Sequence, residues 1–151
     1  MELDDRTSEA FKSVLNSSPM YRHMQMEVQD AREGRSRITL KATEQMHTLY
    51  GMLHGGVAAT ILDTACSIAL GTLLEPGEIS VTVDLRVNYI SNLKEGTLVC
   101  EGRVIHRGKQ TGVSETEVRD QAGNLIAVGM CTHLICAPGD VRRADYPDLE
   151  K

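Results

Sequence analysis

The sequence predicts an α+β domain in which an antiparallel sheet packs against one long apolar helix. The helix is indicated by residues 57–74, a run of eighteen residues in which apolar side chains dominate. The sheet is indicated by alternating polar and apolar segments joined by tight turns, because strands connected in this way pair antiparallel. A sheet covered by a helix is an α+β architecture, and 151 residues suffice for one such domain.

The first part of the chain predicts one helix and two strands. Residues 5–18 combine capping residues with an apolar stripe, and Pro19 ends this helix. Residues 26–29 are expected to form a short strand, and the alternating residues 35–41 a second strand after a turn at Gly34.

The long helix is expected to begin after His54 and to end before Pro76 and Gly77. Its apolar run approaches the length of a membrane span. Asp63 near the middle of the run, several hydroxyl side chains and many alanines favour a helix buried in a protein core instead. We therefore expect no membrane segment.

Four alternating segments follow and predict the strands 80–89, 97–105, 110–119 and 125–135. One face of the first strand is expected to carry Val81, Val83, Leu85, Val87 and Tyr89. We expect residues 1–136 to form a single domain with its N-terminal helix, and the charged residues 137–151 to form a surface tail.

The composition argues against several classes of function. Sixteen basic and twenty-one acidic side chains give a net charge of −5, whereas nucleic-acid binding needs a surface that neutralises phosphates. Four Tyr, one Phe and no Trp leave little to stack on bases. The N-terminus lacks a basic segment followed by an apolar one, so we expect no export signal and a reducing, cytoplasmic location.

Cysteine and histidine residues show no spacing typical of a metal site, so neither a metal nor another cofactor is expected. The cysteines contain no CxxC pair, and three lie in apolar runs, which favours small apolar core residues over disulfides or zinc ligands. They are Cys66, Cys100, Cys131 and Cys136. The histidines outside the helix start are expected in loops or on the surface: His23, His47, His106 and His133.

A motif surrounds the start of the long helix. Residues 51–57 read GMLHGGV, and Asp63 follows seven residues after Gly56. With the predicted order of strands, this motif resembles the hotdog-fold acyl-CoA thioesterases, and among them the phenylacetate-pathway and 4-hydroxybenzoyl-CoA group. The resemblance covers residues 10–136.

This resemblance implies a hotdog fold, in which an antiparallel sheet wraps around one long central helix. It also implies that the chain hydrolyses an acyl-CoA, with coenzyme A entering only as part of the substrate. Members of this family form homodimers with shared active sites, and two such dimers are expected to pair into a tetramer.

The two glycines at the helix start can bring a ligand oxygen close to backbone N–H groups. A helix N-terminus has unpaired N–H groups and a positive partial charge, and Gly55 and Gly56 have no Cβ to block an approach. Such donors stabilise the oxyanion of a thioester under attack. The alternative is that the glycines only allow close packing of helix and sheet.

Asp63 is the single charge in the apolar run. A buried carboxylate without partners is costly, so such a residue has partners or a chemical role. The resemblance implies a general base or a nucleophile in thioester hydrolysis. A structural Asp, bonded within the polar stripe of Thr60, Thr64 and Ser67, is the alternative.

Gly55 and Asp63 cannot act on one thioester from the same chain. They are eight residues apart, which is ~12 Å along a helix. If both act, the Gly55 N–H comes from one subunit and the Asp63 carboxylate from its partner. This spacing therefore predicts an obligate dimer.

Four further residues complete the candidate site. His54 is expected to order the glycine turn or to contact substrate, although a role as general base stays open. Thr48 stands where many relatives carry Asn, so its hydroxyl replaces an amide that would hold water or substrate. Thr82 matches a Ser or Thr near the catalytic carboxylate in some relatives, so it is expected to orient Asp63 or the water, and a strand Thr that only faces outward is the alternative. Ser67 is a candidate substrate contact.

The phosphates of CoA require a local basic patch on this acidic protein. Arg107 and Lys109 at a predicted turn, with Arg86 and Arg103 nearby, are the candidates, and a solvated hairpin is the alternative. Two other functions also stay open. One is a non-enzymatic acyl-CoA-binding module, and the other is a hotdog hydratase or dehydratase, whose loop elements are not found near His54.

Overall fold

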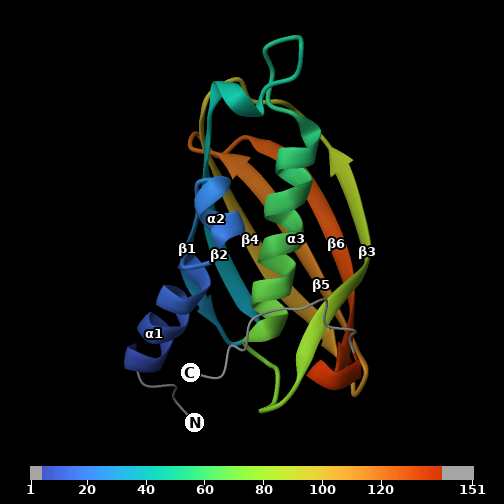
Figure 1. Ribbon diagram of the computed structural model, residues 1–151. Coiled ribbons are helices and arrows are strands. Elements are labelled where there is room, and N and C mark those ends of the chain that lie inside the picture. Colours follow the sequence, from blue (N-terminus) through green and yellow to red (C-terminus); the bar gives the residue numbers. More distant parts are fainter. Residues whose placement is uncertain (1–4, 141–151) are drawn as a thin grey trace.

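The computed structural model describes residues 5–140, in which one six-stranded antiparallel sheet curves around a long helix (Figure 1). The elements are α1 (Asp5–Asn16), α2 (Pro19–His23), β1 (Met26–Arg32), β2 (Arg35–Ala42), η1 (Glu44–Met46), α3 (Gly55–Gly71), β3 (Ile79–Tyr89), β4 (Gly96–Arg107), β5 (Thr111–Asp120), β6 (Leu125–Cys136) and η2 (Pro138–Asp140). The strand order is β1-β2-β4-β5-β6-β3. This arrangement confirms the predicted α+β fold.

The predicted elements are all present; β5 has its predicted length, and the other strands are longer than the sequence indicated. The short helix α2 was not predicted; it begins at Pro19, whose fixed φ suits the first position of a helix. Helix α3 ends at Gly71, several residues before Pro76. The assignment of residues 1–136 to one domain stays a prediction. Residues 1–4 of that domain, and most of the predicted tail, lie outside the described residues.

The core lies between α3 and the sheet. Helix α3 lies along the concave face of the sheet (Figure 1). Its apolar side chains pack against β2, β4 and β5. The fully buried side chains of this core include Ile38, Leu40, Ile61, Leu62 and Leu98. Burial of each such side chain contributes ~1.5–3 kcal/mol to folding, so this seam fixes α3 on the sheet.

Helix α3 and strand β4 approach each other closely at Gly102. A Cβ at this position would lie 2.5 Å from the carbonyl oxygen of Ala65 and 2.7 Å from Ser36 Oγ. Ser36 Oγ donates a hydrogen bond of 2.7 Å to that same carbonyl. Only glycine therefore lets the helix backbone approach the sheet this closely.

We expect Gly102→Ala to lower the free energy of unfolding by about 1–3 kcal/mol, because the methyl group overpacks a rigid backbone contact. Urea denaturation measures this loss. Gly71→Ala is the matched control, since a Cβ there meets nothing within 4 Å, and its expected change is within about 0.5 kcal/mol. An unchanged urea midpoint for Gly102→Ala would contradict this account of the packing.

The prediction that five apolar side chains share one face of β3 is wrong. A β-bulge shifts the register between Thr82 and Asp84, so that Val83 is an extra residue. Val81 and Val83 are 39% and 62% exposed, whereas Leu85 is half-buried. Because the bulge inverts the alternation, Thr82 turns toward α3 in place of its apolar neighbours.

The cysteines are free thiols, and Cys66, Cys100 and Cys131 are buried, as the apolar runs predicted. The expectation for His133 is wrong: it lies on β6 with an exposed fraction of 0%. Its strand alternates between outward and inward positions, and His133 occupies an inward one. None of the helices in residues 5–140 is long and apolar enough to span a membrane.

Candidate active site

His54 caps the start of α3 and leaves one backbone donor open. Its Nδ1 accepts a 2.9 Å hydrogen bond from the Gly56 N–H, so the imidazole carries no proton on Nδ1 in this arrangement. Within residues 5–140, the Gly55 N–H has no hydrogen-bond partner. The predicted Gly56 donor is therefore used within the protein, and Gly55 offers the open N–H at the positive end of the helix.

Tyr89, at the end of β3, lies directly against the start of α3. Its hydroxyl donates a 3.1 Å hydrogen bond to the Gly55 carbonyl oxygen. A Cβ on Gly55 would lie 3.2 Å from the Tyr89 ring. Gly55 thus allows an aromatic side chain to pack beside its open N–H. It serves close packing of Tyr89 as well as the access of a ligand to the N–H.

A cavity of about 540 Å³ adjoins this helix start. Apolar side chains and polar loop residues contribute to its wall. The lining residues are His23, Met24, Gln25, Thr43, Gln45, Met46, His47, His54 and Val57. The cavity has the size and the mixed lining of a small-molecule site, and it reaches the residue that caps α3.

Helix α3 has one partly open stripe on an otherwise buried surface. Thr60, Asp63 and Ser67 are partly exposed along it, whereas the predicted stripe member Thr64 is buried. Thr60 and Thr64 each donate a 2.8 Å hydrogen bond to the carbonyl four residues earlier. Their hydroxyls are therefore satisfied by the helix, and the side chains free for chemistry are Asp63 and Ser67.

The Asp63 carboxylate is held by one hydroxyl and keeps an open oxygen. Its Oδ1 accepts a 2.9 Å hydrogen bond from Thr82 Oγ1, and Cys131 Sγ lies 3.9 Å from the same oxygen. Within the described residues, Oδ2 accepts no hydrogen bond and the carboxylate forms no ion pair. The structure thus brings together the predicted pair Asp63 and Thr82, through the β3 bulge.

Ser67 lies one helical turn after Asp63 and contacts His133. Ser67 Oγ and His133 Nε2 are 3.1 Å apart. Burial lowers the pKa of His133, and the charge of Asp63 opposes this shift. This contact was not predicted. The signal in the sequence is that His133 lies two residues after the apolar Cys131 and therefore shares its face of the strand.

Thr48 makes no hydrogen bond to the other candidate residues. It lies in the loop between η1 and α3, which extends past the end of the sheet (Figure 1). Its Oγ1 accepts from the Tyr50 N–H at 3.2 Å, and its carbonyl accepts from the Gly51 N–H at 3.0 Å. Within one chain, Thr48 therefore stabilises the loop turn.

The candidate CoA-binding cations differ in how far their charge is compensated. Arg107 pairs with Glu78 and donates a 2.8 Å hydrogen bond to the Gly108 carbonyl. The Glu75 N–H, and then Arg107, lower the pKa of Glu78. Among the described residues, Lys109 forms no ion pair. Arg86 and Arg103 also pair with carboxylates, so Lys109 has the freest charge of the four.

We expect Lys109→Ala to raise the KM for an acyl-CoA more than Arg107→Ala, because only Lys109 contributes an uncompensated charge. Steady-state kinetics at low ionic strength measure the difference. Lys41→Ala, at an exposed position on β2, serves as the control. If KM were unchanged in both Lys109→Ala and Arg107→Ala, this turn would not be part of the binding site.

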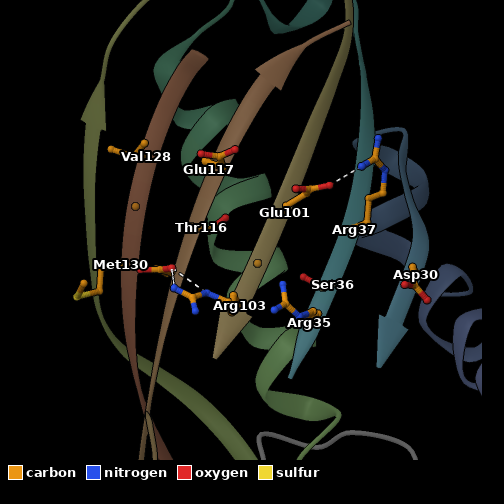
Figure 2. A pocket seen from close by; sticks show the side chains of 13 residues that line it. Asp30, Arg35, Ser36, Arg37, Glu101, Arg103, Thr116, Glu117, Val128 and Met130 are labelled. Carbon is orange, nitrogen blue, oxygen red and sulfur yellow. Dashed lines mark hydrogen bonds and ion pairs between the residues drawn. The ribbon is translucent and has the colours of Figure 1, made fainter. Parts of the chain in front are cut away.

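A second cavity, of about 700 Å³, lies on the sheet face away from α3 (Figure 2). Its charged side chains pair across strands, Arg37 with Glu101 and Arg103 with Glu115. Three arginines and four carboxylates line it. This balance supplies no excess positive charge for phosphates, and the sequence motif does not reach it.

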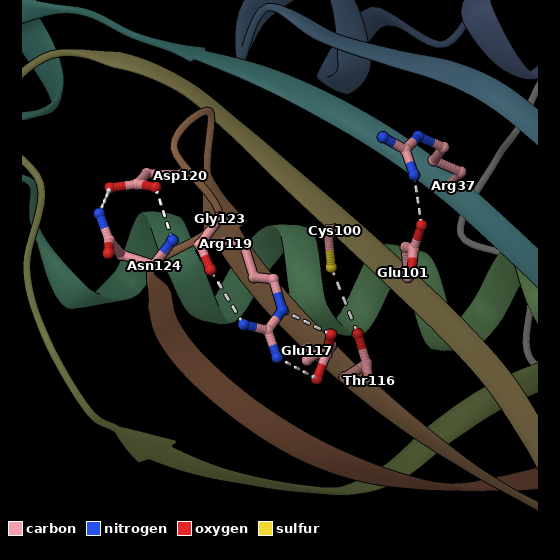
Figure 3. Close-up of polar contacts among 9 residues, drawn as sticks. All are labelled: Arg37, Cys100, Glu101, Thr116, Glu117, Arg119, Asp120, Gly123 and Asn124. Carbon is pink, nitrogen blue, oxygen red and sulfur yellow. Dashed lines mark hydrogen bonds and ion pairs between the residues drawn. The ribbon is translucent and has the colours of Figure 1, made fainter.

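The same face continues into the hairpin between β5 and β6 (Figure 3). Arg119 pairs with Glu117 and donates to the Gly123 carbonyl at 3.0 Å. Asp120 accepts from the backbone of the turn and from the Asn124 side chain. Arg119 lowers the pKa of Glu117. These contacts stabilise the turn. The candidate active-site residues lie on the other face of the sheet, which packs against α3.

A family model described as the thioesterase superfamily matches residues 50–127. A curated relative, the 1,4-dihydroxy-2-naphthoyl-CoA hydrolase of Listeria monocytogenes, is 30% identical over 107 residues, which cover 71% of this chain and 87% of the relative. The chain belongs to the thioesterase superfamily. The matched residues include Gly55, Asp63 and Thr82, and exclude His133.

Solved structures of thioesterases agree with this assignment. A variant of a Staphylococcus aureus thioesterase superposes with a TM-score of 0.76 at 26% identity, covering 80% of this chain and 100% of that chain. A Haemophilus influenzae thioesterase gives a TM-score of 0.79 at 22% identity over 91% and 94% of the two chains, which supports the fold alone. The resemblance, the hotdog fold and membership of a family of thioester hydrolases are thus confirmed.

Proposed function

We propose that this member of the thioesterase superfamily hydrolyses the thioester of an acyl- or aryl-CoA, releasing a carboxylic acid and free CoA. The observation that carries the proposal is the Asp63 carboxylate. It is held by Thr82 and accessible on the open stripe of α3, the helix that begins with the open Gly55 N–H. The Listeria monocytogenes relative is named as a hydrolase of an aryl-CoA, which supports the substrate class.

In the proposed mechanism, the thioester carbonyl oxygen accepts a hydrogen bond from the Gly55 N–H. The partial positive charge of the helix start stabilises the negative charge that develops on this oxygen. Asp63 accepts a proton from a water molecule, whose oxygen attacks the carbonyl carbon. The carbon–sulfur bond then breaks, and the CoA thiolate takes up the proton that Asp63 accepted, which regenerates the carboxylate.

A second copy of the chain completes this site. Gly55 and Asp63 lie on the same helix, ~12 Å apart along its axis, so one thioester must meet Gly55 of one subunit and Asp63 of the other. Strand β3 is an edge of the sheet, and its Val81 and Val83 side chains are exposed. Unpaired apolar edges favour pairing with another chain, so we propose a dimer along β3. Two such dimers would form a tetramer.

The first experiment measures thiol release from short, long and aromatic acyl-CoAs by the wild-type protein. Thiol release from at least one class of acyl-CoA supports the proposal and identifies the class of acyl group that the protein accepts. Saturable binding without release would favour an acyl-CoA-binding module, and addition of water to an enoyl-CoA would favour a hydratase. Sedimentation velocity tests the oligomer: an active protein that sediments as a monomer would contradict the shared site.

A further inference from the structure

Two inward side chains of β6 meet the two open side chains of α3. Cys131 and His133 are two residues apart on the strand and share its inner face. Asp63 and Ser67 are four residues apart on the helix and also share a face. Cys131 contacts Asp63, and His133 contacts Ser67. The helix and the strand are thus joined by two polar contacts, one helical turn apart.

His133 is buried to an exposed fraction of 0%, and its Nδ1 has no hydrogen-bond partner in the described chain. A neutral imidazole places its proton on either Nδ1 or Nε2. A buried N–H without a partner is rarer and more costly than an under-satisfied acceptor. We therefore assign the proton to Nε2, which donates to Ser67 Oγ at 3.1 Å.

This donation changes what the Ser67 hydroxyl does. On the same helix, Thr60 and Thr64 each donate to the carbonyl four residues earlier. Ser67 makes no such bond to the Asp63 carbonyl among the described residues. Because its oxygen accepts from His133, its hydrogen stays free to donate on the open stripe beside the Asp63 carboxylate.

We propose that His133 is a positioning residue that holds Ser67 off the helix backbone, so that the Ser67 hydroxyl donates to the reacting groups at Asp63. This inference rests on the proposed function. His133 acts only through Ser67 and does not contact the substrate. The role requires a donor at the position of Nε2, and it requires no charge on the ring.

Two amide substitutions separate this role from a merely structural one. His133→Gln extends its amide N–H₂ to the position of Nε2, whereas His133→Asn reaches only the position of Nδ1. Both replacement side chains are polar, and neither is larger than that of His133. We expect His133→Gln to keep kcat within a factor of ~2, and His133→Asn to lower kcat by ~10-fold with KM unchanged, the size expected for one lost hydrogen bond.

The double variant Ser67→Ala, His133→Asn tests whether His133 acts through Ser67. We expect Ser67→Ala alone to lower kcat by ~10-fold, and the double variant to be no slower, because coupled residues show non-additive effects. The inference would be overturned if the fold-losses in kcat of the two single variants multiplied in the double variant. It would also be overturned if His133→Asn were as fast as wild type. Thermal melts check that each variant is folded.

The outcomes also separate this inference from the proposed function. If Asp63→Asn is inactive while His133→Asn has wild-type kcat, the positioning role fails and the proposed function stands. If wild type hydrolyses no acyl-CoA, the proposed function fails and the inference fails with it. If Asp63→Asn keeps full activity, Asp63 is not the base and the inference fails, while thioester hydrolysis stands. Should His133→Asn not fold, the comparison of His133→Gln with Ser67→Ala decides: equal losses in the two variants would overturn the role.

Discussion

Replacement of Asp63 by Asn is expected to lower kcat for acyl-CoA hydrolysis by about 10²–10⁴-fold, the usual contribution of a general base. Asn keeps the size of the side chain and can still accept from Thr82 Oγ1, but it cannot take a proton from water. KM should change little, because the substrate contacts remain. Thiol release under saturating acyl-CoA measures kcat.

Thr82→Ala is the matched control for this variant. It removes the hydrogen bond of 2.9 Å that holds the carboxylate but leaves the base in place. We expect a loss of ~10-fold, as for one hydrogen bond to a charged group. Equal activity of wild type and Asp63→Asn, with both folded, would rule out Asp63 as the base.

Gly55→Pro is expected to lower kcat by about 10²–10³-fold, the loss found when one oxyanion donor is removed from an acyl-transfer enzyme. Proline removes the backbone N–H and adds its ring, and the first position of a helix is where it is best tolerated. The preceding His54 already has the extended backbone that a following proline requires, with φ −66° and ψ 133°. Thiol release and circular dichroism measure activity and helix content.

Gly55→Ala separates the lost N–H from the added side chain. It keeps the donor but brings a Cβ to 3.2 Å from the Tyr89 ring, a contact that the exposed Tyr89 side chain can relieve by a small shift. We expect Gly55→Ala to be much more active than Gly55→Pro. If the two variants lose activity equally, the glycine serves packing, and the oxyanion has another donor.

The fold was predictable because its patterns are local. The apolar run that forms α3, the alternation of β2 and β4, and the turn before β6 each follow from short segments of sequence. The carboxylate Asp63 was predictable for the same reason, as a charge that an apolar helix would otherwise exclude. Its partner Thr82 was assigned by resemblance, and the hydrogen bond agrees with that assignment.

The features that escaped prediction depend on contacts between distant segments. The bulge at Val83 inverts the expected face of β3, and strand alternation alone does not reveal a bulge. The burial of His133 depends on which face of β6 meets α3. The expected ordering of the glycine turn by His54 agrees with the hydrogen bond that His54 accepts from the Gly56 N–H, but the use of this N–H in particular depends on a side-chain rotamer. Each of these placements can be found only from the three-dimensional structure, because it depends on how segments far apart in the sequence pack together or on a side-chain conformation.

In the proposed dimer, one active site takes Gly55 from one subunit and Asp63 from its partner. Mixing the two inactive variants, Asp63→Asn and Gly55→Pro, after unfolding and refolding them together tests this arrangement. Each heterodimer then has one site with both native residues and one site with neither. Random pairing makes half of the dimers heterodimers, so about one quarter of wild-type activity should return. A mixture that stays as inactive as its parents, with heterodimers verified by differential tags, would place both residues in sites within a single chain and contradict the account.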